Sequence, residues 1–147
     1  MSTLKIKKLR DNAQIPYRAT EGSAGMDLYA CIDAPVVIEP QKIAVIPTGI
    51  AIELQSADYV ALIYARSGLS IKHGVAPANC VGVVDSDYRG EVCVGLVNQT
   101  DNAFTIVPEQ RIAQLVISPV IIPEIEVVDD LEDTERGSGG FGSTGKK

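Results

Sequence analysis

The sequence predicts an all-β domain, a sandwich or a barrel of short strands with one short helix. Short stretches rich in β-branched residues recur along most of the chain. Proline, glycine, asparagine or aspartate separates nearly all of them, at intervals typical of sandwiches and barrels. The length of 147 residues suits one domain with a real hydrophobic core.

Strands are expected where apolar residues alternate or cluster. Residues 4–7 alternate with a period of two, as a half-buried strand does. Further strands are expected at 36–38, 43–46, 49–54, 59–64, 81–84, 91–97, 103–107, 112–120 and 125–128. The strand over 112–117 is apolar on both faces apart from Gln114, which indicates burial by a second sheet or a neighbouring subunit. Only 67–73 suggests a helix, with Ser67 as its N-cap and Gly74 ending it in a left-handed conformation.

The composition changes after Val128, so we expect a β domain over 1–128 and a flexible C-terminal arm over 129–147. Five acidic residues lie in 129–135, and five glycines in 136–147. The glycines surround Phe141, Ser143 and Thr144, which is the composition of a loop that wraps phosphates through backbone N–H groups. A P-loop is rejected because Lys147 stands where Ser or Thr is needed and no buried strand precedes the glycines.

Charge and hydropathy exclude several classes of partner. The net charge of −6 makes polymeric nucleic acid a poor partner. The first six residues contain no apolar core of signal-peptide length, and no apolar run is long enough to span a bilayer. We therefore expect an intracellular, cytoplasmic protein that binds neither nucleic acid nor membrane.

The cysteines are expected to be buried, reduced thiols. Cys31, Cys80 and Cys93 lie in apolar strings and show no C-x-x-C spacing. His73 is the one histidine, so a zinc site has too few ligands. His73 itself is expected at the surface or at the helix end.

Four polar segments interrupt the apolar background. They are 24–30 around Asp27, 66–68 (Arg-Ser-Gly), 79–90 with an Asp-rich turn read as a β-hairpin, and 111–115 with Arg111 and Gln114. Each has a structural explanation: a turn aspartate, a helix start, hairpin-turn residues and a satisfied core glutamine. Together they supply carboxylate, arginine, serine and glutamine side chains, which suit metal-assisted attack on a polyphosphate.

In this order, the four segments and the Gly-rich stretch of the arm resemble the five motifs of the trimeric dUTPase family. The family patterns are close to A-G-x-D-L, P-R-S-G, G-x-x-D-x-x-Y-x-G, R-I-A-Q and R-G-x-G-G-F-G-S-T-G, and the matches run from Ala24 to Gly145. Two departures appear: Ala65 replaces a usual proline, and Glu109-Gln110 precedes Arg111 where a glycine is common. Neither removes a side chain that the chemistry requires.

The resemblance implies a jelly-roll-like β barrel of the β-clip kind, assembled as a homotrimer whose active sites are shared between subunits. It implies hydrolysis of dUTP to dUMP and pyrophosphate, with Asp85 as the general base. The residues implied to hold uracil and deoxyribose are Asn79, Val84, Asp85, Tyr88 and Phe141. The arm would close over a neighbour's site as a lid.

The resemblance also implies Mg²⁺ as cofactor, with Asp27 holding it from the outer shell through water. The implied phosphate-binding residues are Arg66, Ser67, Gly68, Gln114, Arg136, Ser143 and Thr144. Two alternatives stay open. A relative that deaminates dCTP would need an acid–base glutamate, and Glu91 is the only one near the turn. A regulatory trimer that binds nucleotides without turnover would not require Asp85 or the lid.

Overall fold

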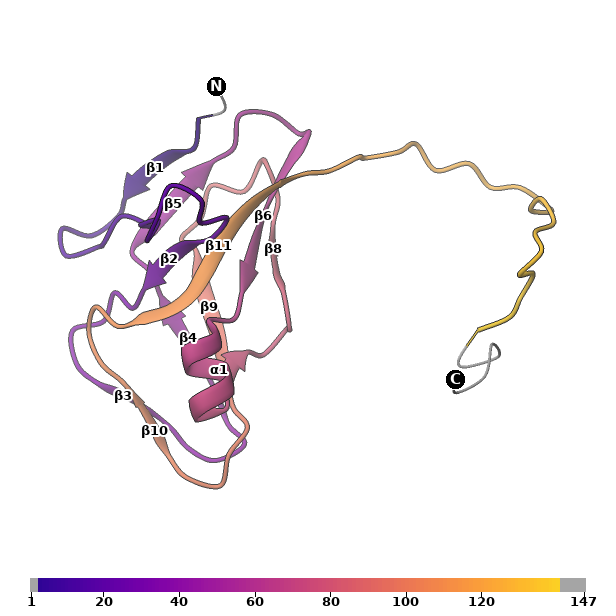
Figure 1. Cartoon of the computed structure of the whole chain (residues 1–147). Helices are drawn as coiled ribbons and strands as arrows, with labels where there is room; N and C mark the ends of the chain where they lie inside the picture. Colours follow the sequence, from indigo (N-terminus) through magenta and orange to yellow (C-terminus); the bar gives the residue numbers. More distant parts are fainter. Residues whose placement is uncertain (1–2, 141–147) are drawn as a thin grey trace.

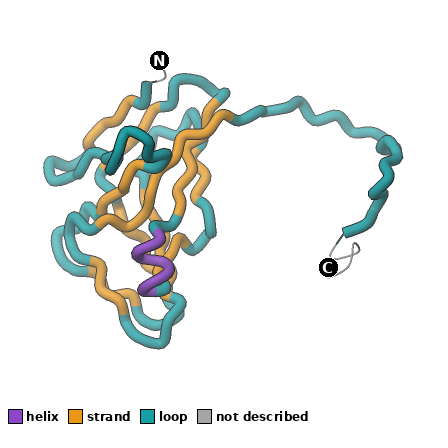
Figure 2. The backbone as a smooth tube through the Cα atoms, in the orientation of Figure 1, coloured by secondary structure: helices purple, strands orange, loops and turns teal. Residues whose placement is uncertain are grey.

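The computed structural model describes residues 3–140, which form short strands in four small sheets and one short helix (Figures 1 and 2). Phe141, Ser143 and Thr144 lie outside the described residues. The elements are β1 (Lys5–Lys8), β2 (Met26–Tyr29), β3 (Val36–Ile38), β4 (Ile43–Pro47), β5 (Ile50–Glu53), β6 (Tyr59–Tyr64), α1 (Ser67–His73), β7 (Val75–Pro77), β8 (Gly82–Val84), β9 (Cys93–Asn98), β10 (Phe104–Ile106) and β11 (Arg111–Pro119).

The largest sheet places the candidate site residues in register. Its strand order is β2-β11-β6-β8, and every pairing within it is antiparallel. Gln114 on β11 pairs with Asp27 on β2 and with Tyr64 on β6, so three strands contribute to one row. The register of β11 against β2 shifts between Arg111 and Ala113, which marks a local irregularity beside that row.

The remaining sheets pack around the same core. Their strand orders are β4-β9-β7, β1-β5 and β10-β3. Burial alternates along β2 and β9, as expected when one face of each strand meets the core. Leu28, Ile63, Leu96 and Leu115 are among the buried residues that form one cluster. Burying each such side chain stabilises the fold by about 1.5–3 kcal/mol.

The helix is confirmed over Ser67–His73, but its cap differs from the prediction. Arg66 is the N-cap, and its carbonyl accepts the N–H groups of Leu69 and Ser70 at 3.0 and 2.9 Å. Ser67 is instead the first helical residue, so its predicted capping role is wrong. Gly74 ends the helix at φ 62°, the predicted left-handed conformation.

Two predictions about strands are wrong. No strand forms at 125–128, because within residues 3–140 these β-branched residues find no partner strand. Segment 79–90 is not a paired hairpin either, since β8 pairs with β6 whereas β9 pairs with β4 and β7. β7 was not predicted: it is short, contains Pro77, and lies at a sheet edge, where proline is tolerated.

The cysteine prediction holds only for Cys31. It is buried, whereas Cys80 and Cys93 are exposed in the single chain, and all three are free thiols. The side chain of His73 is exposed in the last turn of α1, and its ring lies 5.3 Å from that of Phe104, centroid to centroid. This agrees with the expected helix-end position.

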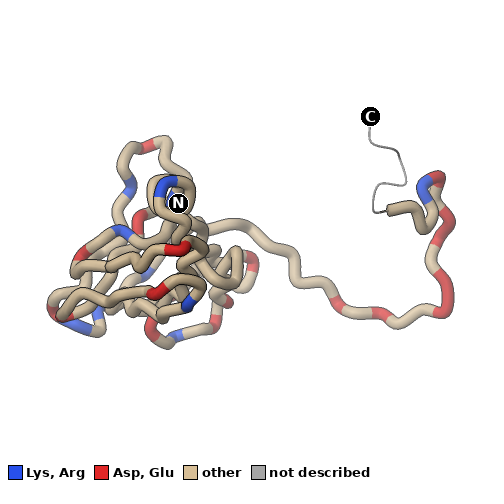
Figure 3. The backbone as a smooth tube through the Cα atoms, turned by 90° about the horizontal axis from the view of Figure 1, so that it is seen from below, with Lys and Arg blue, Asp and Glu red and all other residues tan. Residues whose placement is uncertain are grey.

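After β11 the chain leaves the sheets as an extended segment (Figure 1). Residues 120–140 contain neither helix nor strand, and acidic residues follow one another along part of this segment (Figure 3). Ile121, Ile125, Val127 and Leu131 are largely exposed there. Within residues 3–140, no helix has the length and apolar character needed to cross a membrane. The predicted domain boundary at Val128 stays a prediction.

Candidate active site

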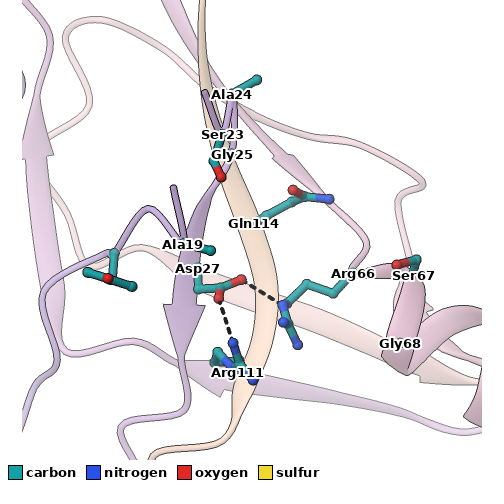
Figure 4. A pocket seen from close by; sticks show the side chains of 11 residues that line it. Ala19, Ser23, Ala24, Gly25, Asp27, Arg66, Ser67, Gly68, Arg111 and Gln114 are labelled. Carbon is teal, nitrogen blue, oxygen red and sulfur yellow. Dashed lines mark hydrogen bonds and ion pairs between the residues drawn. The ribbon is translucent and has the colours of Figure 1, made fainter. Parts of the chain in front are cut away.

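Five of the predicted site residues line one pocket of about 370 Å³ (Figure 4). Asp27 comes from β2, Gln114 from β11, and Arg66, Ser67 and Gly68 from the start of α1. The other lining residues are Tyr17, Ala19, Ser23, Ala24, Gly25 and Arg111. The pairing of β11 with β2 and with β6, which leads directly into α1, therefore brings three sequence segments to one place.

Asp27 lies between two arginines. Its Oδ1 accepts the Nε–H of Arg66 at 2.6 Å, and its Oδ2 accepts a hydrogen bond from Nη1 of Arg111 at 3.2 Å (Figure 4). The Asp27 side chain is 13% exposed, that of Arg66 26% and that of Arg111 53%. Two positive charges therefore surround one negative charge at the pocket wall. This excess of positive charge favours an anionic ligand, although the whole chain is acidic.

Gln114 and Gly25 fit against each other. Nε2 of Gln114 donates to the carbonyl of Ala65 at 2.8 Å, next to Arg66 in the sequence. A Cβ at Gly25 would lie 2.3 Å from Oε1 of Gln114, so any larger residue at position 25 would displace the Gln114 side chain. The contact uses the backbone carbonyl of Ala65, which the usual proline would also supply.

Sequence reasoning assigned no role to two residues of this site. Arg111 was noticed in its motif, but only the structure reveals that it pairs with Asp27. Tyr17 lines the pocket, and its carbonyl accepts the backbone N–H of Asp27 at 2.8 Å. Tyr17 lies in an isolated bridge outside the motifs, so no sequence signal marked it.

The base-binding candidates line a different pocket. Val84, Asp85 and Tyr88, with Val83, Glu91, Val92 and Cys93, surround a cavity of about 280 Å³. The Tyr88 hydroxyl donates to the carbonyl of Glu91 at 3.1 Å. A Cβ at Gly90 would lie 2.4 Å from that hydroxyl, so a larger residue at position 90 would displace the Tyr88 side chain.

The remaining candidates lie apart from both pockets. Asn79 is exposed and lines neither of them. Arg136 lies on the extended segment, where its Nε donates to the carbonyl of Gly139 at 2.9 Å. Within residues 3–140, neither pocket is lined by residues of both groups.

The side chains of the pocket suit a metal ion that is held mainly by a bound phosphate ligand. Within residues 3–140, no group of three or more His, Cys, Asp or Glu side chains is arranged to hold a metal ion. The Asp27 carboxylate has four lone-pair sites and uses two of them for arginines. It can therefore still accept a hydrogen bond from a metal-bound water, which is the predicted outer-shell role.

The chain is an all-β protein whose antiparallel sheets carry a pocket walled by Asp27 and two arginines. Proteins of this class are suited to polyphosphate chemistry. The family model described as dUTPase matches residues 11–145. The deoxyuridine 5'-triphosphate nucleotidohydrolase of Ralstonia pickettii is 51% identical over 143 residues, 97% of each chain. That of Thiobacillus denitrificans is 48% identical over 144 residues, 98% of this chain and 99% of the relative.

Solved structures of dUTPases are also similar to this chain. The dUTPase of Staphylococcus bacteriophage 80alpha, solved with dUPNHPP, superposes with a TM-score of 0.87 at 33% identity, over 97% of this chain and 98% of its own. A mutant dUTPase from phage phi11 of S. aureus, solved to describe a structural Mg(II) ion, gives a TM-score of 0.80 at 28% identity, over 89% and 99%. The chain belongs to the dUTPase family. The predicted fold class, a jelly-roll-like β barrel with one short helix, is confirmed.

Proposed function

We propose that this chain is a dUTP diphosphatase, which hydrolyses dUTP to dUMP and pyrophosphate. The observation that carries the proposal is the pocket where Asp27 lies between Arg66 and Arg111, because it supplies the positive charge that a triphosphate requires. The names of relatives about 50% identical over nearly the whole chain support the same substrate. The reaction would limit uracil incorporation into DNA and supply dUMP for dTTP synthesis.

Asp85 is proposed as the general base. Its carboxylate would take a proton from the attacking water while the water oxygen forms a bond to the α-phosphorus. The bond from that phosphorus to the oxygen shared with the β-phosphorus breaks, and pyrophosphate leaves with the electron pair. Arg66, Ser67, Gly68 and Gln114 would hold the phosphates in line for this displacement.

Specificity for deoxyuridine would come from the other pocket. Asn79 and Val84 would face the uracil, and Tyr88 would lie against the deoxyribose and leave no room for a 2′-hydroxyl. Cytosine would present the wrong donor and leave buried polar groups unpaired. From the arm, Phe141 would stack on the uracil, whereas Arg136, Ser143 and Thr144 would bind the γ-phosphate.

Mg²⁺ is proposed as the cofactor, with Asp27 as its outer-shell holder. When bound, it would neutralise charge on the phosphates and polarise the α-phosphorus. The chain's own contribution is to orient Arg66 and Arg111 through Asp27, so that both guanidinium groups are in place for the phosphates. The phage phi11 relative with a structural Mg(II) ion supports a metal in this family.

A homotrimer with shared active sites is the proposed assembly. Phosphate-binding and base-binding candidates line different pockets of one chain, so a complete site needs a second subunit. Residues 120–140 extend away from the sheets (Figure 1), which suits an arm over 129–147 that reaches a third subunit. Since dUTP is an intracellular nucleotide, we propose that the enzyme works in the cytoplasm.

The dCTP deaminase alternative is disfavoured by the contacts of Glu91. Its Oε1 accepts the N–H of Gly49 at 2.8 Å, and its Oε2 lies 3.4 Å from Nη2 of Arg10. A carboxylate with both oxygens engaged is poorly placed to shuttle protons at a cytosine amino group.

The deciding experiment measures pyrophosphate release from dUTP, dCTP, dTTP and UTP, with Mg²⁺ or EDTA. We expect release from dUTP alone, weakened by EDTA and abolished by Asp85→Asn. Removal of residues 137–147 should also abolish turnover and leave the trimer intact in sedimentation. Binding of dUTP without release would favour the regulatory trimer, and ammonia from dCTP would favour the deaminase.

A further inference from the structure

The segment 85–92 carries two of the proposed site residues but has little regular structure of its own. It connects β8 and β9, which belong to different sheets and do not pair with each other. One backbone turn lies inside it, with the N–H of Tyr88 bonded to the carbonyl of Asp85 at 3.2 Å, and its other internal hydrogen bonds come from the side chains of Tyr88 and Arg89. The positions of Asp85 and Tyr88 therefore depend on what ties the segment to the rest of the fold.

Two side chains tie the segment to the rest of the fold by hydrogen bonds. At its end, the Thr48 hydroxyl donates to the carbonyl of Val92 at 2.5 Å, and the N–H of Val92 donates to the carbonyl of Ile50 at 2.8 Å. Glu91 makes the side-chain tie nearer to Tyr88. Its carboxylate accepts the backbone N–H of Gly49 at 2.8 Å, and its side chain is 24% exposed. A charge-assisted hydrogen bond in a largely desolvated setting is among the strong ones. The ion pair with Arg10 contributes less, because its N···O distance is 3.4 Å and Arg10 is 44% exposed.

Gly49 is a fixed anchor for this tie. Its φ of 71° is a left-handed conformation that favours glycine. A Cβ here would also lie only 2.6 Å from Sγ of Cys31 and 2.7 Å from Cβ of Ala13, so the position is restricted to glycine. Its carbonyl accepts the N–H of Leu9 at 2.7 Å, so both of its backbone polar groups are engaged. The N–H that meets Glu91 is thus held in one direction.

Glu91 also contacts Tyr88. The carbonyl of Glu91 accepts the Tyr88 hydroxyl at 3.1 Å, and both residues line the pocket that contains Asp85. One chain of contacts therefore runs from Gly49 through Glu91 to the ring that would lie against the sugar.

We infer that Glu91 is a positioning residue for sugar discrimination, which rests on the proposed dUTP hydrolysis. Its carboxylate fixes the segment 85–92 on Gly49, and its carbonyl holds Tyr88 at the distance that excludes a 2′-hydroxyl. Without this tie, Val92 would stay bonded to Thr48 and Ile50, whereas the part of the segment that carries Tyr88 would shift and the pocket would widen toward the ribose.

The test compares kcat/KM for dUTP with kcat/KM for UTP in the full chain. Glu91→Ala should lower the dUTP/UTP ratio at least tenfold. Glu91→Gln keeps an oxygen that accepts the N–H of Gly49, so it should stay within about threefold of the native ratio. Glu39→Ala is the matched control, because Glu39 is exposed and its side chain makes none of the hydrogen bonds or ion pairs found in residues 3–140.

Each outcome decides the inference. An unchanged ratio in Glu91→Ala overturns it, even if that variant melts at a lower temperature. An equal loss of the dUTP/UTP ratio in Glu91→Gln also overturns it, because the negative charge of the carboxylate, and not its hydrogen bond to Gly49, would then cause the effect. If Glu91→Ala does not fold, Glu91→Met keeps the apolar stem and is read in the same way.

A native chain without dUTP turnover would refute the proposed function separately. The tie itself is then measured by hydrogen exchange, without turnover. Faster exchange of the Gly49 amide in Glu91→Ala than in Glu91→Gln supports the tie, and equal rates refute it.

Discussion

Asp27→Asn should destabilise the fold by about 2 kcal/mol. Hydrogen bonds to charged groups contribute roughly 1.5–3 kcal/mol each. The Arg66 contact, at 2.6 Å between side chains 26% and 13% exposed, earns a value near the middle of that range. The Arg111 contact is discounted to about 0.5 kcal/mol because that arginine is 53% exposed. The asparagine oxygen can still accept one weaker bond, which leaves a net loss of about 2 kcal/mol.

The assay is thermal unfolding at one fixed subunit concentration, since oligomers melt at concentration-dependent temperatures. For a chain of this size, a loss of about 2 kcal/mol lowers Tm by roughly 4–8 °C. Double-mutant cycles then separate the partners. The cycle with Arg66→Gln should give a coupling of about 1–2 kcal/mol, and the cycle with Arg111→Gln about 0.5 kcal/mol or less.

One result would refute this reasoning. If Asp27→Asn melts within 1 °C of the native chain and changes only the Mg²⁺ dependence of turnover, then Asp27 serves the metal alone and does not orient the arginines.

Three further predictions follow from single contacts. Gly25→Ala should cost about 1–3 kcal/mol and lower kcat/KM, because it displaces Gln114 from its hydrogen bond and rotamer; unchanged turnover would contradict this. Asn98→Ala should cost about 3–4 kcal/mol in urea unfolding, since this fully buried side chain makes four hydrogen bonds; a loss under about 1 kcal/mol would contradict it. Cys93 is exposed in the single chain, but neighbouring atoms still desolvate its thiol in part; this desolvation, helped by the charge of Glu91, raises the pKa of the thiol, so its alkylation at pH 8 should be slower than that of Cys80, read by mass spectrometry.

The strand pattern was predictable where a strand has a strong local signal. Tyr59–Tyr64 and Val36–Ile38 form as predicted, because β-branched residues between turn formers favour a pleated, half-buried backbone. The helix was found for a similar reason, since Gly74 ends it in a conformation that glycine adopts at little cost.

The errors occurred where pairing decides the structure. The β-branched residues at 125–128 have strand propensity but no partner within residues 3–140, so they stay extended and exposed. The strands around the Asp-rich turn look like a hairpin in the sequence, but each finds its partner in a different sheet. Cys80 and Cys93 sit in apolar strings, but alternation and turn position place them at the surface.

The sequence by itself determined the fold class, the family resemblance and the residue types of the site, because these depend on composition, order and spacing along the chain. Only the tertiary structure decided which residues meet. It brought Arg111 onto Asp27 from 84 residues away and tied Glu91 to Gly49 across 42. It also separated the base-binding candidates from the phosphate-binding ones. The physical reason is that strand pairing and side-chain packing are long-range choices, fixed by the free energy of the whole fold and by no local pattern.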